Sequence, residues 1–470
     1  MTTTAALTTP RVPALTARQG LEKLATYSFA VLTVVDADGY PLSVAVSASV
    51  DPAAGRVAFA APAGIALPAD AEVSLTGSHI RPQPGYGYDE RRHVTVWGRA
   101  EVAGDMVTFA AARAWGWDEA EVPFFEYSER SVGQSRRYFD ALTAERGTPV
   151  KPRLDLRWLA LRTTRLPFLT ATIVPVVLGI AIAARQGTFD LLTAVLTVVG
   201  AAFVQLGLNV ANDVFDSVQG ADEANVTPTQ FSGGSRVIQY GLVTLRQMAG
   251  LATVFYLGAA AIGLILLALR GSSALLAIGV IGFVVSIGYT APPLKLVYRG
   301  LGEIAVALGF GPLMLLGAYV VQTRGTLTWE PVVASLPIAL LVALILYVNE
   351  IPDRRGDARA GKRTLPVRLP KAIVIGGYRI AAVAAYVIVV AGVAAGLLPI
   401  PALLALLSIP LALQVSRGLE PNYDNPYALM AVMGVNVKLH LVAGVLLLAG
   451  YLVALVAGAL APSVSLFIGK

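Results

Sequence analysis

Residues 331–349 read PVVASLPIALLVALILYVN, an apolar run without a charged side chain. A helix of this length crosses a hydrocarbon core about 30 Å thick, because an α-helix rises about 1.5 Å per residue. Outward from this run, apolar segments of similar length follow one another from Leu166 onward, separated by short polar loops. The sequence therefore predicts an all-α polytopic membrane domain over residues 166–470.

We predict nine membrane spans in this domain: 166–185, 190–210, 247–269, 273–290, 301–322, 331–349, 372–397, 399–416 and 437–459. The loops after the even-numbered spans hold most of the cations: Arg236, Arg246, Lys295, Arg299, Arg354, Arg355, Arg359, Lys362, Arg363, Arg368 and Arg417. The other side holds little beyond Arg185, Arg270, Arg324 and Lys470. This asymmetry predicts a multi-pass protein of the plasma membrane in which the loops after the even-numbered spans face the cytoplasm.

The composition excludes several kinds of site and partner. Of the 470 residues, 56% are hydrophobic and only 14% are charged, too few to cover an ordinary soluble surface. Cysteine is absent, which excludes disulfides and thiolate chemistry, and the three histidines are too scattered for a three-histidine metal site. The net charge of +6 is distributed as expected for the inner face of a bilayer, so we predict no nucleic-acid partner.

Residues 1–145 have mixed polarity and predict a separate domain. Its first twenty residues lack the apolar segment of a secretory signal, so we expect this domain to stay in the cytoplasm. Asp38-Gly39 separates two β-rich runs and predicts a hairpin. We predict strands at 29–35, 42–50, 56–60, 72–76 and 93–102, and helices at 19–26, 106–115 and 130–145. This pattern favours a small antiparallel β barrel with short helices, joined to the membrane domain by a basic linker over 146–165.

The loop after the second span is rich in oxygen ligands. It contains Asn209, Asn212, Asp213, Asp216 and Asp222. If the span continues as a helix, Asn209, Asn212 and Asp216 share one face, because they are three and four residues apart. Carboxylate and amide oxygens suit Mg²⁺, which binds through a few carboxylates together with substrate phosphates.

The loop after the sixth span repeats this device with Asp353 and Asp357, one helical turn apart. Two facing carboxylate clusters repel each other unless a cation lies between them. Mg²⁺ bridged by a diphosphate meets that requirement. A single Asp-x-x-x-Asp is usually no more than a solvated loop, whereas two such clusters on one predicted side favour a functional site.

Two segments between the acidic loops predict phosphate contacts. Ser232-Gly-Gly-Ser-Arg236 offers backbone N–H groups and a guanidinium. Tyr289-Thr-Ala-Pro-Pro-Leu-Lys295 continues to Arg299, which places Lys295 and Arg299 one turn apart at the membrane surface. The alternative for these two cations is that they only anchor the chain on the positive-inside face.

With these motifs, the chain resembles the UbiA superfamily of intramembrane prenyltransferases. The Asn-Asp-x-x-Asp pattern of that family is matched by Asn212-Asp213-Val-Phe-Asp216, and its Asp-x-x-x-Asp pattern by Asp353-Arg-Arg-Gly-Asp357. The resemblance covers about residues 155–465. NDVFDSVQGAD, SGGSRVI, YRGLGE and GKRTLPVRL most resemble the branch that prenylates 1,4-dihydroxy-2-naphthoate in menaquinone synthesis.

The resemblance implies Mg²⁺-dependent transfer of a polyprenyl group from polyprenyl diphosphate to an aromatic acceptor. It implies that Mg²⁺ is held by Asn212, Asp213, Asp216, Asp222, Asp353 and Asp357, and that Asp216, Asp353, Asp357 and Lys295 are catalytic. It also implies substrate binding by Asn209, Asn212, Arg236, Tyr289, Arg299, Lys362 and Arg363. Fixed charge around the leaving diphosphate would be the main catalytic contribution.

The N-terminal domain resembles the pyridoxamine 5′-phosphate oxidase-like split barrels, through FAVLTVVDADGYPLSVAV and HVTVWGRAEV. Many of those barrels bind FMN. The segment from Ala63 to Ala71 contains no Lys or Arg for a flavin phosphate, so we predict that no FMN is bound. We instead expect a barrel that supports a homodimer or caps the membrane enzyme.

Three alternatives stay open at this stage. The enzyme could prenylate a different aromatic ring. The chain could be a polytopic transporter with a regulatory ligand-binding barrel, although transporters place ionisable residues near the bilayer midplane rather than at one end of the spans. A ligand-sensing protein with a membrane anchor would leave the paired acidic loops unexplained.

Overall fold

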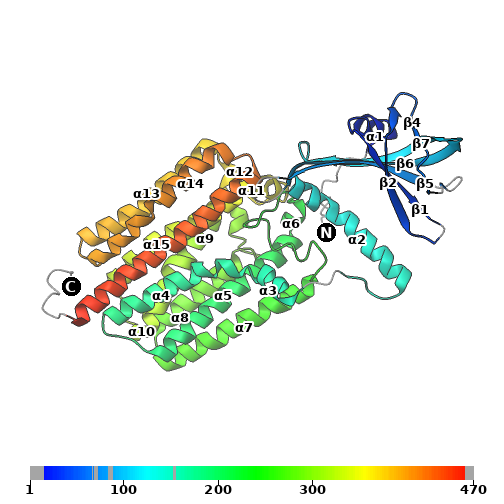
Figure 1. Cartoon of the computed structure of the whole chain (residues 1–470). Helices are drawn as coiled ribbons and strands as arrows, with labels where there is room; N and C mark the ends of the chain where they lie inside the picture. The colour runs from blue at the N-terminus through cyan, green and yellow to red at the C-terminus, as the bar shows by residue number, and fades with distance from the viewer. Residues whose placement is uncertain are drawn as a thin grey trace. The chain divides into compact units, whose positions relative to one another are not determined.

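The computed structural model describes residues 15–36, 38–65, 67, 72–82, 88–151 and 155–460. The chain forms two compact units (Figure 1). The boundary lies between Gln134 and Ser135. This boundary falls inside one helix, α2 (Phe124–Arg146). Each unit has its own core.

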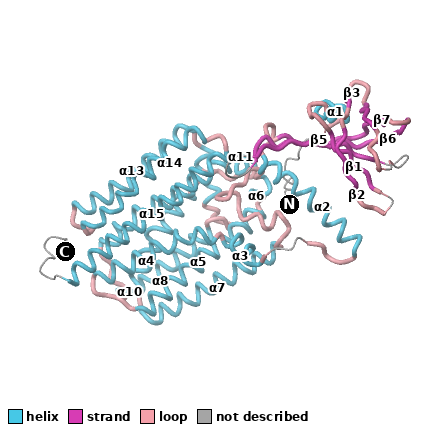
Figure 2. The backbone as a smooth tube through the Cα atoms, viewed as in Figure 1, coloured by secondary structure: helices cyan, strands magenta, loops and turns pink. Residues whose placement is uncertain are grey.

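The strands, magenta in Figure 2, belong to the first unit. They form a seven-stranded sheet in which every pair of neighbours is antiparallel. The strand order is β2-β1-β5-β6-β7-β4-β3. The strands are β1 (Ala30–Val35), β2 (Pro41–Val46), β3 (Ser49–Asp51), β4 (Arg56–Ala60), β5 (Glu72–Pro82), β6 (Tyr88–Ala103) and β7 (Met106–Asp118). The antiparallel domain predicted from the sequence is confirmed.

Alternating side chains build the core of this unit. On β1, Leu32 and Val34 are buried, and their neighbours in sequence are less buried, as the period of two in a strand requires. The short helix α1 (Ala17–Leu24) adds Leu21 and Leu24 to the same cluster. Thr16 and Gln19 form a reciprocal capping box at its first turn, a device that contributes about 1 kcal/mol.

Two sequence predictions in this unit are wrong in detail. Residues 106–115, predicted as a helix, belong to strand β7. Their alanines favour a helix, but Val107 and Phe109 alternate inward and the strand is paired on both edges, with β4 and β6. Tertiary pairing therefore overrides the local preference. The second predicted strand is split into β2 and β3. The segment from Ala63 to Ala71, on which the FMN prediction depends, lies mostly outside the described residues.

The second unit is helical. After α2 come α3 (Leu156–Thr164), η1 (Leu166–Leu169), α4 (Thr170–Arg185), α5 (Leu191–Val218), α6 (Ala221–Ala224), α7 (Leu245–Arg270) and α8 (Ser273–Gly288). They are followed by η2 (Val297–Arg299), α9 (Gly302–Leu308), the π-helical turn η3 (Gly309–Leu313), α10 (Met314–Thr323) and α11 (Trp329–Arg359). The last elements are α12 (Leu365–Arg368), α13 (Lys371–Ala394), η4 (Ile400–Ser408), α14 (Ile409–Asn422) and α15 (Pro426–Leu460).

Helices occupy all nine positions at which spans are predicted. Within the described residues, seven are long and apolar enough to cross a membrane: 191–218, 245–270, 302–323, 329–359, 371–394, 400–422 and 426–458. The remaining two, α4 and α8, are apolar but shorter, at 16 residues each. The chain is therefore a multi-pass membrane protein, and the full count of nine spans stays a prediction.

The loops are sorted to two ends of the helical unit. At one end, Arg185 pairs with Glu330 at 2.6 Å, and Arg270 pairs with Asp190 at 3.1 Å. Asp190 also accepts a hydrogen bond from the Thr193 N–H and so caps α5. The loops that follow α5, α8 and α11 meet at the other end, where the acidic motifs lie.

Candidate active site

The first acidic motif lies on the last turns of α5. This helix continues without a break to Val218, so Asn209, Asn212 and Asp216 share one face as predicted. All three line one polar cavity. Asp213 points elsewhere: it pairs with Arg165 and accepts a hydrogen bond from the Ser235 N–H at 3.2 Å. Asp213 therefore holds neighbouring segments together within this structure.

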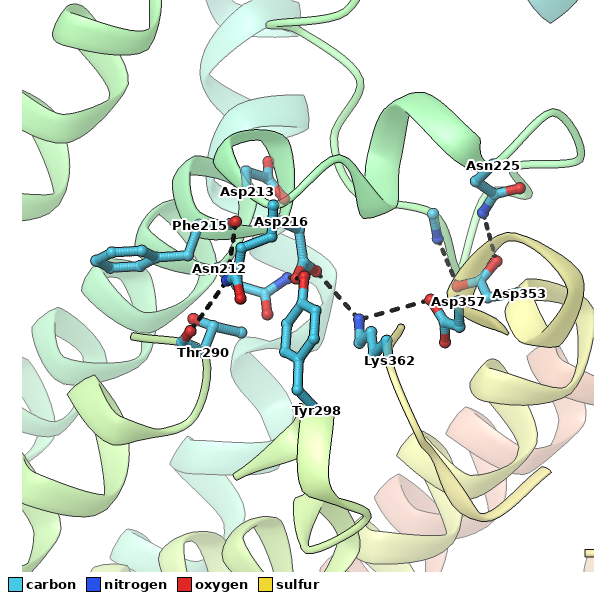
Figure 3. A network of polar contacts seen from close by, with 12 residues as sticks. Asn212, Asp213, Phe215, Asp216, Asn225, Thr290, Tyr298, Asp353, Asp357 and Lys362 are labelled. Atoms are coloured by element: carbon cyan, nitrogen blue, oxygen red, sulfur yellow. Dashed lines mark hydrogen bonds and ion pairs between the residues drawn. The ribbon is translucent and has the colours of Figure 1, made fainter. Parts of the chain in front are cut away.

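The second motif lies at the end of α11. Asp353 and Asp357 are one turn apart and both line the same polar cavity. Asp353 accepts a hydrogen bond from Asn225 Nδ2 at 2.8 Å (Figure 3). It accepts a second from the Gly233 N–H at 2.9 Å. These bonds connect α11 to the loop after α5.

Two glycines permit this close approach. A Cβ on Gly356 would lie 3.0 Å from the backbone of Asn225. A Cβ on Gly234 would lie 2.8 Å from a carboxylate oxygen of Asp222, and Gly234 also has a positive φ of 75°. Side chains at these positions would push the loop away from the carboxylates.

Lys362 bridges the two motifs. Its Nζ lies 3.2 Å from Oδ2 of Asp216 and 3.8 Å from Oδ1 of Asp357 (Figure 3). Burial disfavours the charged ammonium, but Asp216 and Asp357 outweigh that effect and raise the pKa of Lys362 well above its usual value. In this structure, the lysine supplies the positive charge that the facing carboxylates require.

Asp222 is the least satisfied carboxylate of the group. It is 4% exposed, and its Oδ2 has no hydrogen-bond partner among the described residues. Burial, followed by the charges of Asp216 and Asp213, raises the pKa of Asp222 well above its ordinary value. An added cation would stabilise its ionised form.

Asn225 and Tyr298 also belong to the site, although neither is among the residues predicted from the sequence motifs. The Tyr298 hydroxyl donates to Oδ1 of Asp216 at 2.7 Å (Figure 3). Burial and the charge of Asp216 raise the pKa of Tyr298, so the phenol stays a donor. One available signal was proximity in sequence: Tyr298 lies between Lys295 and Arg299, and Asn225 lies three residues after Asp222.

The structure brings together only part of the predicted set. Eight predicted residues line the polar cavity, which has a volume of about 180 Å³: Asn209, Asn212, Asp216, Asp222, Tyr289, Asp353, Asp357 and Lys362. The others lie outside its described lining: Asp213, Arg236, Lys295, Arg299 and Arg363.

The predicted phosphate-binding cations outside the cavity have other contacts. Arg236 is buried and donates to the backbone oxygen of Asp222. Arg299 donates to the backbone oxygen of Pro293 at 2.9 Å, and Lys295 Nζ lies 5.7 Å from the centre of the Tyr298 ring. Arg363 is exposed, and its backbone N–H donates to the backbone oxygen of Tyr298. The structure thus uses these residues to build the loops around the cavity.

A second, apolar cavity adjoins the polar one. Its volume is about 550 Å³, and it is lined mainly by side chains of α5, α7, α8, η3 and α10. Both cavities are lined by Gln205, Leu208, Tyr289, Val306 and Phe310, so they meet at these residues. The site therefore combines a charged end with a larger hydrocarbon-like space.

The donor set at the charged end fits Mg²⁺ that arrives with phosphate oxygens. Among the described residues, no three His, Cys, Asp or Glu side chains are close enough to form a complete metal cage. Mg²⁺ does not need one, because it usually keeps waters and binds through one or two carboxylates and substrate phosphates. The buried, unpartnered oxygen of Asp222 beside Asp216 is a suitable ligand of this kind.

Comparison with known proteins places the chain in a family. The model of the UbiA prenyltransferase family matches residues 172–442. The 2-carboxy-1,4-naphthoquinone phytyltransferase of Synechocystis is 29% identical, over 63% of this chain and 92% of that protein. The 1,4-dihydroxy-2-naphthoate octaprenyltransferase of Escherichia coli is 33% identical, over 45% of this chain and 68% of that protein.

A solved UbiA homolog from Archaeoglobus fulgidus, bound to GPP and Mg²⁺, is 14% identical, with a TM-score of 0.43 over 62% of this chain and 99% of that one. The family match spans more than half of the chain, from α4 into α15, and includes both acidic motifs. The chain therefore belongs to the UbiA prenyltransferase family and is a prenyltransferase.

Proposed function

We propose that this enzyme transfers a polyprenyl group from polyprenyl diphosphate to an aromatic ring, with Mg²⁺ as cofactor. One observation carries the proposal: a polar cavity bordered by carboxylates of α5 and α11 adjoins a larger apolar cavity between helices. A lipid diphosphate has the same two parts, a charged head and a hydrocarbon chain.

The diphosphate would lie at the charged end of the site. Asn212, Asp216, Asp222, Asp353 and Asp357 would hold Mg²⁺, which would neutralise the diphosphate and assist its departure. Lys362 would turn from the carboxylates to the phosphate oxygens, since its ammonium already lies between the two motifs. The Tyr298 hydroxyl would keep Asp216 in position.

The apolar cavity would hold the prenyl chain. Its walls include small residues such as Gly200, Gly263 and Gly279, which leave room for branched hydrocarbon. Dry walls also protect the allylic cation from water after the carbon–oxygen bond breaks. Tyr289 lies where the two cavities meet, so the reacting carbon would pass close to it.

We propose 1,4-dihydroxy-2-naphthoate as the acceptor, which would place the enzyme in menaquinone synthesis. Supporting this, the two relatives described above carry names that refer to naphthoate or naphthoquinone substrates. Their names differ in the prenyl group, phytyl in one and octaprenyl in the other. We therefore assign no chain length.

In our proposal, nine helices cross the plasma membrane and the acidic end faces the cytoplasm, together with the N-terminal domain. We propose an N-terminal domain over 1–145, a linker over 146–165 and a membrane domain over 166–470. The two compact units of the structure divide between Gln134 and Ser135, inside the last helix of the proposed N-terminal domain. The N-terminal domain would be a split barrel that supports a homodimer and binds no FMN.

The decisive experiment measures the product itself. Purified enzyme would be incubated with Mg²⁺, a radiolabelled prenyl diphosphate and a panel of hydroxylated aromatic acids, and the product mass determined. A product equal to the naphthoate ring plus one prenyl group, with or without loss of CO₂, is expected. Transfer to a different ring alone would replace the acceptor, and no transfer to any ring would overturn the proposal.

A further inference from the structure

A pair of glutamates beside the site has no role in the function described so far. Glu350 lies on α11, three residues before Asp353, and is 5% exposed. Glu303 lies in the first turn of α9 and is 8% exposed. The two carboxyl groups are within hydrogen-bonding reach of each other. Buried carboxyl groups that face one another need a proton or a cation between them.

Lys362, the cation that acts on Glu350, forms its ion pairs with other carboxylates. Lys362 interacts electrostatically with Glu350, but the contacts of its ammonium are with Asp216 and Asp357. Full ionisation of both glutamates would therefore leave buried negative charge without a counter-ion. A pair that holds one shared proton carries half of that buried charge and can still take up one proton more.

Glu350 is also part of the cavity wall. It lines the polar cavity, and neither of its carboxyl oxygens has a hydrogen-bond partner that is part of the described structure, apart from the facing Glu303. The neighbouring Asn349 lines the cavity too, and its Oδ1 is likewise unpartnered. Two residues of the cavity wall thus carry three buried acceptor oxygens, and the proton of the glutamate pair can serve only one of them at a time. A hydroxyl group of a ligand would supply a donor there.

We infer that Glu350, supported by Glu303, binds a hydroxyl group of the aromatic acceptor and takes its proton during prenyl transfer. This inference rests on the proposed function. It places the acceptor ring at Asn349 and Glu350, with the diphosphate on the aspartate side. Tyr289, which interacts electrostatically with both Glu350 and Lys362, would lie between the two substrates.

Prenyl transfer can replace either a hydrogen or the carboxyl group of the ring. The new bond joins C1 of the prenyl group to a ring carbon, and the C1–oxygen bond breaks with its electron pair leaving on the diphosphate. The hydroxyl proton moves to Glu350 as the ring attacks, so the oxygen becomes a keto group. The attacked carbon then loses either its hydrogen, as a proton that passes to the released diphosphate, or its carboxyl group, as CO₂. In both cases the oxygen recovers its proton from Glu350.

The test uses Glu350→Gln in the full-length enzyme, with 1,4-dihydroxy-2-naphthoate and geranylgeranyl diphosphate. The amide keeps the shape but cannot take a proton, so kcat should fall by about 10²-fold or more, a typical contribution of a general base. The Mg²⁺ requirement and the KM for the diphosphate should stay near those of the wild type. A ring whose hydroxyl is already ionised should restore much of the rate.

The matched control is Glu303→Gln, which leaves the carboxyl group of Glu350 in the cavity and should cost less. If Glu350→Gln does not fold, Glu350→Asp replaces it and should lower kcat with the acceptor in the same selective way. A wild-type rate in Glu350→Gln, or a change confined to the Mg²⁺ requirement, would overturn the inference alone. Failure of the wild type to prenylate any ring would overturn the proposed function as well.

Discussion

The ammonium nitrogen of Lys362 lies 3.2 Å from Oδ2 of Asp216, and this contact joins residues 146 positions apart in the chain. It places a positive charge between the two acidic motifs, close to Asp357 as well. The same carboxylates are the proposed ligands of Mg²⁺. Lysine and metal ion would therefore compete for them in the absence of a diphosphate, and would cooperate when a diphosphate is present.

The first prediction follows from this competition. In Lys362→Met, Mg²⁺ alone should stabilise the protein more than it stabilises the wild type, because the carboxylates have lost their internal counter-ion. Binding of inorganic diphosphate with Mg²⁺ should weaken, and prenyl transfer should fall on the order of a hundredfold, since a buried charge-assisted contact is worth about 1.5–3 kcal/mol. Thermal unfolding in detergent, with each ligand titrated, measures both effects.

Lys371→Met is the matched control, because Lys371 pairs with Asp424 and lies outside the described lining of both cavities. It should leave both responses unchanged. An equal response of Lys362→Met and wild type to Mg²⁺ would mean that the lysine and the metal do not share ligands.

The second prediction separates two aspartates on one turn of α11. Asp357→Asn should abolish Mg²⁺-dependent transfer with little loss of stability, because the contact of Asp357 is the longer ion pair with Lys362. Asp353→Asn should lose activity and also about 1–3 kcal/mol of stability. Both carboxylate oxygens of Asp353 accept a hydrogen bond, one from Asn225 Nδ2 and one from the Gly233 N–H. The substituted side chain has an NH₂ group in place of one oxygen, so one of these donors would lose its acceptor.

Unfolding midpoints and transfer rates at several Mg²⁺ concentrations distinguish these variants. Near-normal turnover of Asp357→Asn at low Mg²⁺ would contradict the model of two metal-binding motifs.

The third prediction concerns topology. The chain has no cysteine, so single cysteines at Arg359 and Thr326 can be labelled with a membrane-impermeant reagent. Both positions are exposed, whereas Gln219 bonds to the backbone oxygens of Phe215 and Thr290 and is less suitable. Position 359 should react only from the cytoplasmic side and position 326 only from the outside. Labelling of both from the same side would refute the arrangement.

The fourth prediction concerns the N-terminal domain. The described residues that line the two cavities all lie at or after Arg165, so a protein that begins at Lys151 should retain prenyl transfer. It loses the bond from Arg136 to the backbone oxygen of Gln239, and its stability or oligomeric state should suffer. The full-length protein should be colourless.

Absorbance near the flavin bands and an activity assay of the truncated protein test the two parts separately. Stoichiometric FMN in the full-length protein would overturn the cofactor prediction. A folded but inactive truncated protein would mean that the N-terminal domain helps to build the active site.

The sequence by itself determined the membrane class, the positions of the apolar helices in the second unit and the two acidic motifs. Apolar runs can only be buried in lipid or in each other, and period and spacing are local properties that need no tertiary contact. For the same reason, the shared face of Asn209, Asn212 and Asp216 was predictable, because it depends only on the continuation of α5.

Tertiary structure alone decided which polar side chains meet. It turned Asp213 toward Arg165, kept Lys295 and Arg299 out of the cavity, brought Tyr298 to Asp216, and set Glu303 against Glu350. It also made residues 106–115 a strand, because they pair with β4 along one edge and with β6 along the other. Such contacts depend on where distant segments pack, and a hydrogen bond to a charged group, at about 1.5–3 kcal/mol, exceeds the helix preference of an ordinary residue, at most about 0.7 kcal/mol.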